Sequence, residues 1–312
     1  MLLALRILLF FLVCCLPGSA PAAGAGHKVK VIASFSILGD MVKNVGGGRV
    51  EVTTLVGPNS DTHVFQPTPA AARAVAEASL VVVNGLGFEG WLDRLIRTSG
   101  FKGPVVVATK GIKPRDLALG EEGRHAHAPG GKHERKIDPH AWQDLSNGLV
   151  YVENIAKGLS AVDPAGAAVY QANAAAYAAQ LLELDRWVKA RFAAIPPGKR
   201  RMITSHDALG YFGAAYGIKI ITPMGLSTES EAAAGDIARL IKLIRAEKIA
   251  AVFVENVTDP RLMEQVAREG GATLGGRLFS DALSQPGEEA PTYIDMFKNN
   301  VTKIAAAMGQ GG

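Results

Sequence analysis

Leu80-Val81-Val82-Val83-Asn84 is a run of four apolar residues that ends at a polar one. Such a run is typical of a strand that is buried on both faces in a parallel sheet. Strand and helix patterns alternate on either side of it, with strands expected at residues 29–34, 50–56 and 105–107 and helices at residues 37–45, 70–78 and 91–98. We therefore expect an α/β domain whose mainly parallel sheet is flanked by helices.

The alternation resumes in the C-terminal half of the chain. Strand patterns are found at residues 202–204, 218–222, 251–254 and 278–279, and helical patterns at residues 208–216, 229–246, 260–268 and 293–308. The sequence therefore predicts two α/β lobes, an N-terminal lobe over residues 26–162 and a C-terminal lobe over residues 196–312.

The longest helical pattern, residues 163–195, lies between the two lobes. Asp163-Pro164 suits a helix start, and Pro196-Pro197-Gly198 ends the pattern. At ~1.5 Å per residue the helix would be ~45 Å long, so we predict a stiff connector that limits hinge motion. Charged residues at 183, 185, 189 and 191 are expected toward solvent, and apolar positions recur at Ala168, Ala172, Ala175, Ala179, Leu182 and Trp187.

The composition is that of a globular protein, with 48% hydrophobic and 20% charged residues among 312. The formal net charge is +4, and it is one unit lower without Arg6, the only charged residue before His27. Basic residues are dispersed apart from Lys199-Arg200-Arg201, so we expect no nucleic-acid partner.

Residues 1–25 have the features of a secretory signal peptide: a positive start, a short apolar run and small residues near the end. We expect export to the periplasm. Cys14 and Cys15 both lie in this leader, and the residues before Cys14 lack the small side chains expected at a lipidation site, although lipidation at either cysteine stays open. Because no cysteine follows, any metal must be held by His, Asp or Glu.

Two short segments share one arrangement around a histidine. Asp61-Thr62-His63-Val64-Phe65 and Asp138-Pro139-His140-Ala141-Trp142 each have Asp two residues before the His and an aromatic residue two after it. A proline stiffens the backbone nearby, and the aromatic ring shields the imidazole from water, so each segment suits a metal-binding histidine. We interpret the two segments as halves of one site.

Four candidate ligands follow strands or lie in the loops that join strands to helices: His63, His140, His206 and Asp281. In open α/β sheets, ligands bind outside the carboxyl ends of strands, so two lobes facing each other would bring these loops to one cleft. Three imidazoles and one carboxylate suit tetrahedral Zn²⁺.

Residues 111–136 interrupt the strand-helix alternation with Gly, Pro, charged residues and His125, His127 and His133. We expect a surface loop. One interpretation is a solvated linker, and the other is an accessory, flexible collector of metal.

The chain resembles the cluster A-I (cluster 9) solute-binding proteins of bacterial zinc and manganese ABC importers, over nearly everything after the leader. The resemblance is carried by the His63 loop with Pro67 and Pro69 and by three further motifs and a carboxylate: Asp138-Pro139-His140-Ala141-Trp142, Ser205-His206-Asp207, Phe253-Val254-Glu255-Asn256 and Asp281. It implies two α/β lobes joined by one long rigid helix, with the metal in the cleft between them.

The resemblance also implies a non-enzymatic, monomeric periplasmic protein that captures Zn²⁺ and delivers it to an ABC transporter permease, with a possible accessory periplasmic metallochaperone. Family members that select manganese usually have Glu where this chain has His206, and nitrogen-rich ligation favours zinc over Mn²⁺. Glu255 is expected to orient a metal ligand without binding the metal itself, or to have a structural role. Asp61 and Asp138 could orient a histidine or cap a turn.

Three alternatives stay open. One is a manganese-binding member of the same family, and another is a metal chaperone or surface adhesin on the same scaffold. The third is a secreted zinc hydrolase, which would need an open metal position for water and a base such as Glu255. No Walker-type phosphate loop is present in the sequence, so ATP hydrolysis would belong to a partner.

Overall fold

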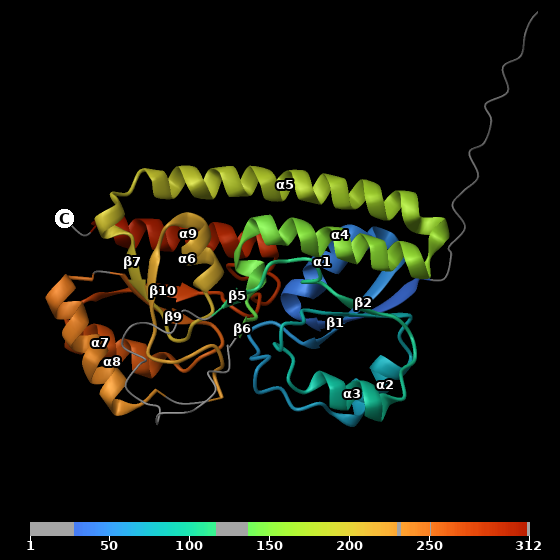
Figure 1. Ribbon diagram of the computed structural model, residues 1–312, viewed down its shortest axis with the longest axis horizontal. Coiled ribbons are helices and arrows are strands. Elements are labelled where there is room, and N and C mark those ends of the chain that lie inside the picture. The colour runs from blue at the N-terminus through green and yellow to red at the C-terminus, as the bar shows by residue number, and fades with distance from the viewer. Residues whose placement is uncertain (1–27, 117–136, 230–231, 250, 311–312) are drawn as a thin grey trace, which may run out of the picture.

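The computed structural model describes residues 28–116, 137–229, 232–249 and 251–310. These residues form two α/β lobes, each built on a four-stranded parallel sheet, as the sequence predicted (Figure 1). The strand order is β2-β1-β3-β4 in the N-terminal lobe and β10-β9-β7-β8 in the C-terminal lobe. The expected signal peptide with Cys14 and Cys15, and the three loop histidines His125, His127 and His133, lie outside the described residues.

The N-terminal sheet and its helices are formed by β1 (Val29–Phe35), α1 (Ser36–Gly46), β2 (Val50–Val56), α2 (Pro69–Ala76), β3 (Leu80–Val83), α3 (Leu92–Ser99) and β4 (Val105–Val107). The C-terminal lobe contains β7 (Arg201–Ile203), α6 (Gly210–Tyr216), β8 (Lys219–Ile221), α7 (Ala234–Glu247), β9 (Ala251–Glu255), α8 (Pro260–Gly270), β10 (Thr273–Leu278) and α9 (Tyr293–Gln310). The chain between the two sheets forms β5 (Arg115–Asp116), β6 (Ile137–Asp138), α4 (Leu145–Val162) and α5 (Ala167–Ala193).

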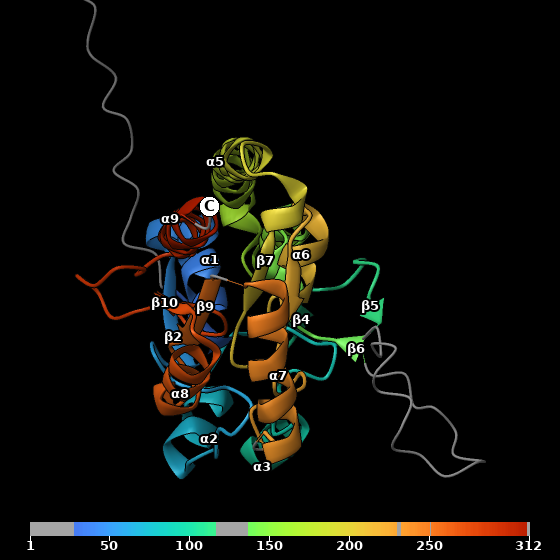
Figure 2. The same ribbon diagram turned by 90° about the vertical axis from the view of Figure 1, so that its left-hand side faces the viewer.

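The helices form two layers, one on each side of the sheets (Figures 1 and 2). On one side α5 runs along both lobes, above α4 and α9, and on the other side α2 and α3 lie under the N-terminal sheet and α7 and α8 under the C-terminal sheet. A large hydrophobic core continues from one lobe into the other, and a smaller one lies between the C-terminal sheet and α7 and α8. The two lobes therefore share one layer of helices and one main core.

Helix α5 differs from its sequence pattern in its start and in its buried face. Asp163 Oδ1 accepts the Gly166 N–H, and Pro164–Gly166 form a short 3-10 helix before the α-helix begins at Ala167. The buried residues are Tyr170, Tyr177, Leu181, Leu184, Val188 and Phe192. The apolar recurrence in the sequence therefore did not identify the buried face, and Leu182, one of its positions, is 47% exposed. The other positions are Ala168, Ala172, Ala175, Ala179 and Trp187. Large aromatic and aliphatic side chains bury more apolar area than alanines, so they determine which face packs.

Of the segment expected to be a surface loop, residues 111–136, the structure describes residues 111–116, which include β5, and β6 follows the segment directly. β5 and β6 pair in antiparallel fashion, with Arg115 opposite Asp138. This pairing places Asp138 on a strand two residues before His140. Within the described ranges, no helix is both long and apolar enough to cross a membrane.

Candidate metal centre

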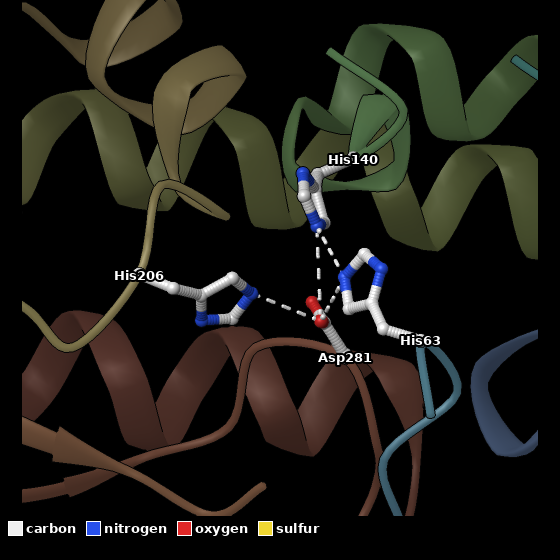
Figure 3. Close-up of side chains that lie close together, drawn as sticks. All are labelled: His63, His140, His206 and Asp281. Atoms are coloured by element: carbon white, nitrogen blue, oxygen red, sulfur yellow. Dashed lines mark hydrogen bonds and ion pairs between the residues drawn. The ribbon is translucent and has the colours of Figure 1, made fainter. Parts of the chain in front are cut away.

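The four candidate ligands come from four separate segments and point toward one another (Figure 3). His63 lies in the loop after β2, His206 follows β7, and Asp281 follows β10. His140 lies between β6 and the 3-10 helix Ala141–Gln143. Because β2, β7 and β10 end toward the space between the lobes, the loops after them meet there, as expected for the carboxyl ends of strands in open α/β sheets.

The ligand atoms of the four side chains lie within 4.8 Å of one another. Asp281 Oδ2 is 3.3 Å from His63 Nε2, 3.7 Å from His140 Nε2 and 3.1 Å from His206 Nε2. The Nε2 atoms of His63 and His140 are 3.3 Å apart. A tetrahedral ion with ligands at ~2.0–2.1 Å separates neighbouring ligands by ~3.3 Å, so these distances fit one small divalent cation.

The donor set has one atom without a partner. Asp281 is fully buried, and its Oδ1 has no hydrogen-bond partner among the described residues. An unpaired buried carboxylate oxygen is costly, and a cation beside it removes that cost. The residues present therefore fit a divalent metal ion, which Asp281 could bind through one oxygen or both.

The site is closed off from solvent by its own residues and by aromatic rings. His140, His206 and Asp281 are fully buried, and the His63 side chain is 7% exposed. The ring of Phe88 packs edge-on against His63, with centroids 4.9 Å apart, and Trp142 packs against His140 at 5.3 Å. A bound ion would therefore be shielded from water, which strengthens its electrostatic attraction to the ligands.

His140 is held by the carboxylate of Asp138. Asp138 Oδ1 accepts the His140 backbone N–H at 3.0 Å and lies 2.9 Å from its Nδ1. Asp138 thus fills both roles considered from the sequence, because it caps the turn and also contacts the imidazole. Its other oxygen is 3.0 Å from Arg115 Nη1. With Nδ1 engaged by Asp138, Nε2 of His140 points at the other three ligands.

His206 is contacted by a carboxylate as well, but Glu255 uses a different oxygen for each of its two contacts. Glu255 Oε1 accepts the His206 backbone N–H at 2.9 Å, and Oε2 lies 2.8 Å from His206 Nδ1. Glu255 is only 2% exposed and lies at the end of β9. The geometry places its carboxylate behind His206, on the side of the imidazole opposite Asp281.

The His63 loop is supported differently. Asp61 Oδ1 accepts the His63 backbone N–H at 2.9 Å, so Asp61 caps this turn, and its Oδ2 accepts from Thr228 of the C-terminal lobe at 2.5 Å. Trp91 Nε1 donates to the Thr62 carbonyl at 2.9 Å. The two histidine segments that look alike in sequence therefore differ in structure, since only Asp138 contacts its imidazole.

The buried charges shift the pKa values of the ligands. Burial lowers the pKa of His140, but the carboxylates of Asp281 and Asp138 outweigh it and raise the pKa from 6.5 to about 9. Burial also opposes the charge on His206, whose pKa is raised by Glu255 and Asp281. Burial favours the neutral form of Asp281, but His140 and His206 hold its pKa well below the usual value. Without metal, the centre therefore holds protons that a cation would displace.

Some residues around the site had no sequence signal. Arg115 lies in the segment interpreted as a solvated loop, and Phe88 follows a glycine-rich turn with no obvious motif. Glu89 is buried and accepts from Ser34 Oγ at 2.6 Å and from the Asn84 backbone N–H at 2.6 Å, and burial raises its pKa. Only the folded chain brings Arg115 to Asp138 and Phe88 to His63.

The chain is similar to several known metal-binding proteins. Residues 31–307 match the family model described as "Zinc-uptake complex component A periplasmic". The chain is 35% identical over 286 residues to the "Manganese-binding lipoprotein MntA" of Halalkalibacterium halodurans, which covers 91% of this chain and 90% of that protein.

Two solved structures share the fold. The Mn-bound periplasmic metal binding protein of Candidatus Liberibacter asiaticus aligns with a TM-score of 0.78 at 32% identity, covering 90% of this chain and 100% of that one. The periplasmic zinc binding protein TroA of Treponema pallidum aligns with a TM-score of 0.81 at 28% identity, covering 90% of this chain and 99% of that one.

Proposed function

The chain belongs to the family of periplasmic zinc-uptake components, the solute-binding proteins of metal ABC transporters, and from this premise we propose that it captures Zn²⁺ and delivers it to an ABC-type membrane importer. In this proposal His63, His140, His206 and Asp281 are the ligands. The observation that carries the proposal is the convergence of these four donors, from both lobes, at the spacing of a tetrahedral ion.

The choice of zinc rests on the donor atoms. Three imidazole nitrogens and one carboxylate suit Zn²⁺, whereas Mn²⁺ prefers more oxygen ligands and a higher coordination number. Manganese is the alternative, and two observations favour it: relatives are named as manganese-binding proteins, and Asp281 has a second, unpaired oxygen that could add a fifth ligand atom. Competition between the two metals distinguishes them.

The lobes hold the captured ion between them. His63 and His140 belong to the N-terminal lobe and His206 to the C-terminal lobe, so metal binding adds cross-links between the lobes and orders the loops around the site. Helix α5 runs along both lobes and limits how far they separate. Release then requires the permease, or an accessory metallochaperone, to pull at least one ligand away from a buried ion.

The hydrolase alternative needs an open metal position and a free general base. Here four protein donors surround the centre, and both oxygens of Glu255 contact His206. Membership in a transporter family also favours capture over catalysis. We propose that the protein binds its metal without turnover and that ATP hydrolysis belongs to the importer.

Residues 1–25 are proposed to direct export to the periplasm. Several relatives are named lipoproteins, which favours a lipid anchor at Cys14 or Cys15 as an alternative to cleavage near residue 25. Intact-mass measurement of the exported protein separates the two, because a lipid-anchored chain would begin at a modified cysteine.

Competitive titration of residues 26–312 tests the function. We expect one tightly bound Zn²⁺ per chain that outcompetes Mn²⁺, and an unchanged affinity when His125, His127 and His133 are all replaced by Ala. Tighter binding of Mn²⁺ would move the assignment to the manganese alternative. Absence of tight binding of either metal would overturn the proposed function.

A further inference from the structure

The loop that carries Asp281, residues Ser280–Ser284, is called the Asp281 loop below. It follows β10 of the C-terminal lobe, but every one of its residues is buried against the rest of the protein, with exposures of 0 to 3%. A loop this deeply buried must find partners for its backbone groups. The identity of those partners decides with which lobe Asp281 moves.

Residues of the N-terminal lobe hold the start of the loop. The Ser280 carbonyl accepts from Gln143 Nε2 at 2.6 Å and from Trp142 Nε1 at 3.0 Å. Trp142 and Gln143 belong to the 3-10 helix that directly follows His140. The residue before Asp281 is therefore attached to the segment that presents His140.

The N-terminal lobe also holds the other end of the loop. The Leu283 N–H donates to Ser36 Oγ at 2.9 Å, and the Leu283 carbonyl accepts from the Asn59 N–H at 2.9 Å. Ser36 begins α1, and Asn59 lies four residues before His63. Further on, the Tyr293 N–H donates to Asp40 Oδ2 at 3.0 Å. Asp281 thus lies between two anchor points on the lobe that carries His63 and His140.

The C-terminal lobe holds the same loop through the side chain of Asn256. Its Nδ2 donates to the Ala282 carbonyl at 3.1 Å, and its Oδ1 is 3.4 Å from the Ser280 N–H. Asn256 Nδ2 also contacts Asn59 Oδ1 of the other lobe at 3.0 Å. This side chain lies at the boundary and touches both sides.

His206 is held by its own lobe. Its N–H and Nδ1 contact Glu255 on β9, and the N–H of the next residue, Asp207, donates to the Gly225 carbonyl at 3.0 Å. The N-terminal lobe meets this region further along the chain, where Tyr211 Oη accepts from the Arg115 N–H at 2.8 Å. His206 therefore follows the C-terminal sheet.

We propose that four positioning residues of the N-terminal lobe, Ser36, Asn59, Trp142 and Gln143, hold Asp281 so that it moves with that lobe. The N-terminal lobe then carries three of the four ligands and the C-terminal lobe carries one. His63, His140 and Asp281 form one preorganised group, and His206 alone moves with the C-terminal lobe. This inference rests on the proposed metal-binding function. By chain order alone, each lobe would carry two ligands, and Asp281 would move away from the metal together with His206 when the lobes separate. The inference replaces that division.

The division has a consequence for delivery. When the lobes are pulled apart, the ion loses the His206 imidazole first and keeps two imidazoles and one carboxylate. A three-ligand site has an open position, so water or a ligand from the importer can enter there. The ion would pass to the importer from the N-terminal lobe.

The test is a set of double-mutant cycles on zinc affinity, measured by chelator competition. Gln143→Met keeps the length of the side chain and removes the N–H donor, and Ser36→Ala removes the second anchor. Each is combined with His206→Ala and with Asp281→Ala, and Gln180→Met, at an exposed position on α5, is the control.

Each anchor variant should weaken zinc binding about tenfold in the wild-type and His206→Ala backgrounds, the size expected for one lost hydrogen bond to a buried backbone group. In the Asp281→Ala background it should have no further effect, because the anchors act through Asp281. An equal loss in the Asp281→Ala background, or none in the other two, overturns the inference. Failure of the wild-type protein itself to bind zinc or manganese would instead remove the proposed function.

Discussion

Glu255 contacts His206 at two points: one carboxylate oxygen accepts the backbone N–H at 2.9 Å and the other lies 2.8 Å from Nδ1. Both side chains are fully or almost fully buried. This pairing fixes the position of the imidazole and leaves Nε2 directed at Asp281, 3.1 Å away. It is the counterpart of the Asp138–His140 pair in the other lobe.

Replacing Glu255 should therefore weaken metal binding although Glu255 is not among the four converging donors. We expect Glu255→Ala to lower zinc affinity by roughly 10- to 100-fold, the range found for outer partners of metal-bound histidines. Glu255→Gln should lose less, because its amide oxygen still accepts the backbone N–H. Zinc competition measures both, and Glu264→Ala, exposed on α8, is the control. Equal affinities in all three variants would contradict a role for Glu255 behind His206.

The pH dependence of binding should extend above neutrality. Because the pKa of His140 in the metal-free protein is about 9, the proton that zinc must displace is still bound at neutral pH. Zinc affinity should therefore keep rising from pH 6.5 to about 9. Isothermal titration in buffers of different ionisation enthalpy should detect proton release at neutral pH. An affinity that levels off above pH 6.5 would argue against this charge state.

The stability of the metal-free protein should change in the opposite direction. A histidine whose folded pKa lies above its ordinary value stabilises the fold fully below the ordinary pKa, here 6.5, and loses that contribution as pH rises through about 9. We expect the melting temperature without metal to fall over this interval and the shift on adding zinc to grow. His140→Gln should flatten the fall, and an unchanged slope in that variant would exclude His140 as its source.

Gly210 at the start of α6 makes room for the Arg115–Asp138 ion pair. A Cβ at this position would lie 2.0 Å from Arg115 Nη1 and 2.7 Å from Asp138 Oδ2. Asp138 cannot yield easily because its other oxygen is bonded to His140. We expect Gly210→Ala to destabilise the metal-free protein by about 1–3 kcal/mol, as overpacking usually does.

Urea unfolding of the metal-free variants measures this effect. Gly198→Ala is the matched control, since a Cβ there meets nothing within 4 Å, and it should stay within about 0.5 kcal/mol of wild type. Equal stabilities for Gly210→Ala and Gly198→Ala would mean that the ion pair shifts at no cost.

The sequence predicted the strands of the N-terminal sheet well. The expected strand at residues 80–84 matches β3, Leu80–Val83, and the strand at residues 105–107 matches β4. A short run of β-branched residues favours a strand of a parallel sheet, and here it gave the buried β3 and also the edge strand β4, whose Val105 and Val107 are exposed. The helix expected from residue 229 begins only at Ala234, because alanine-rich segments carry no strong start signal.

The sequence did not predict the contacts between residues that lie far apart along the chain. The four candidate ligands could be placed after strands, because the carboxyl ends of parallel strands are where such sites form. Their separations could not be predicted, nor could the bonds from Gln143 and Ser36 to the Asp281 loop, which join residues more than a hundred positions apart. Such contacts depend on how the lobes pack, and local patterns do not encode that packing.

X-ray absorption at the zinc edge tests the central claim most directly, because outer-shell scattering counts the imidazoles bound to the metal. The zinc complex of residues 26–312 should contain four-coordinate zinc with three imidazoles and one oxygen donor at ~2.0–2.1 Å. His206→Ala should remove one imidazole and leave the other two. A six-coordinate, oxygen-rich shell, or a spectrum unchanged by His206→Ala, would contradict a centre built from His63, His140, His206 and Asp281.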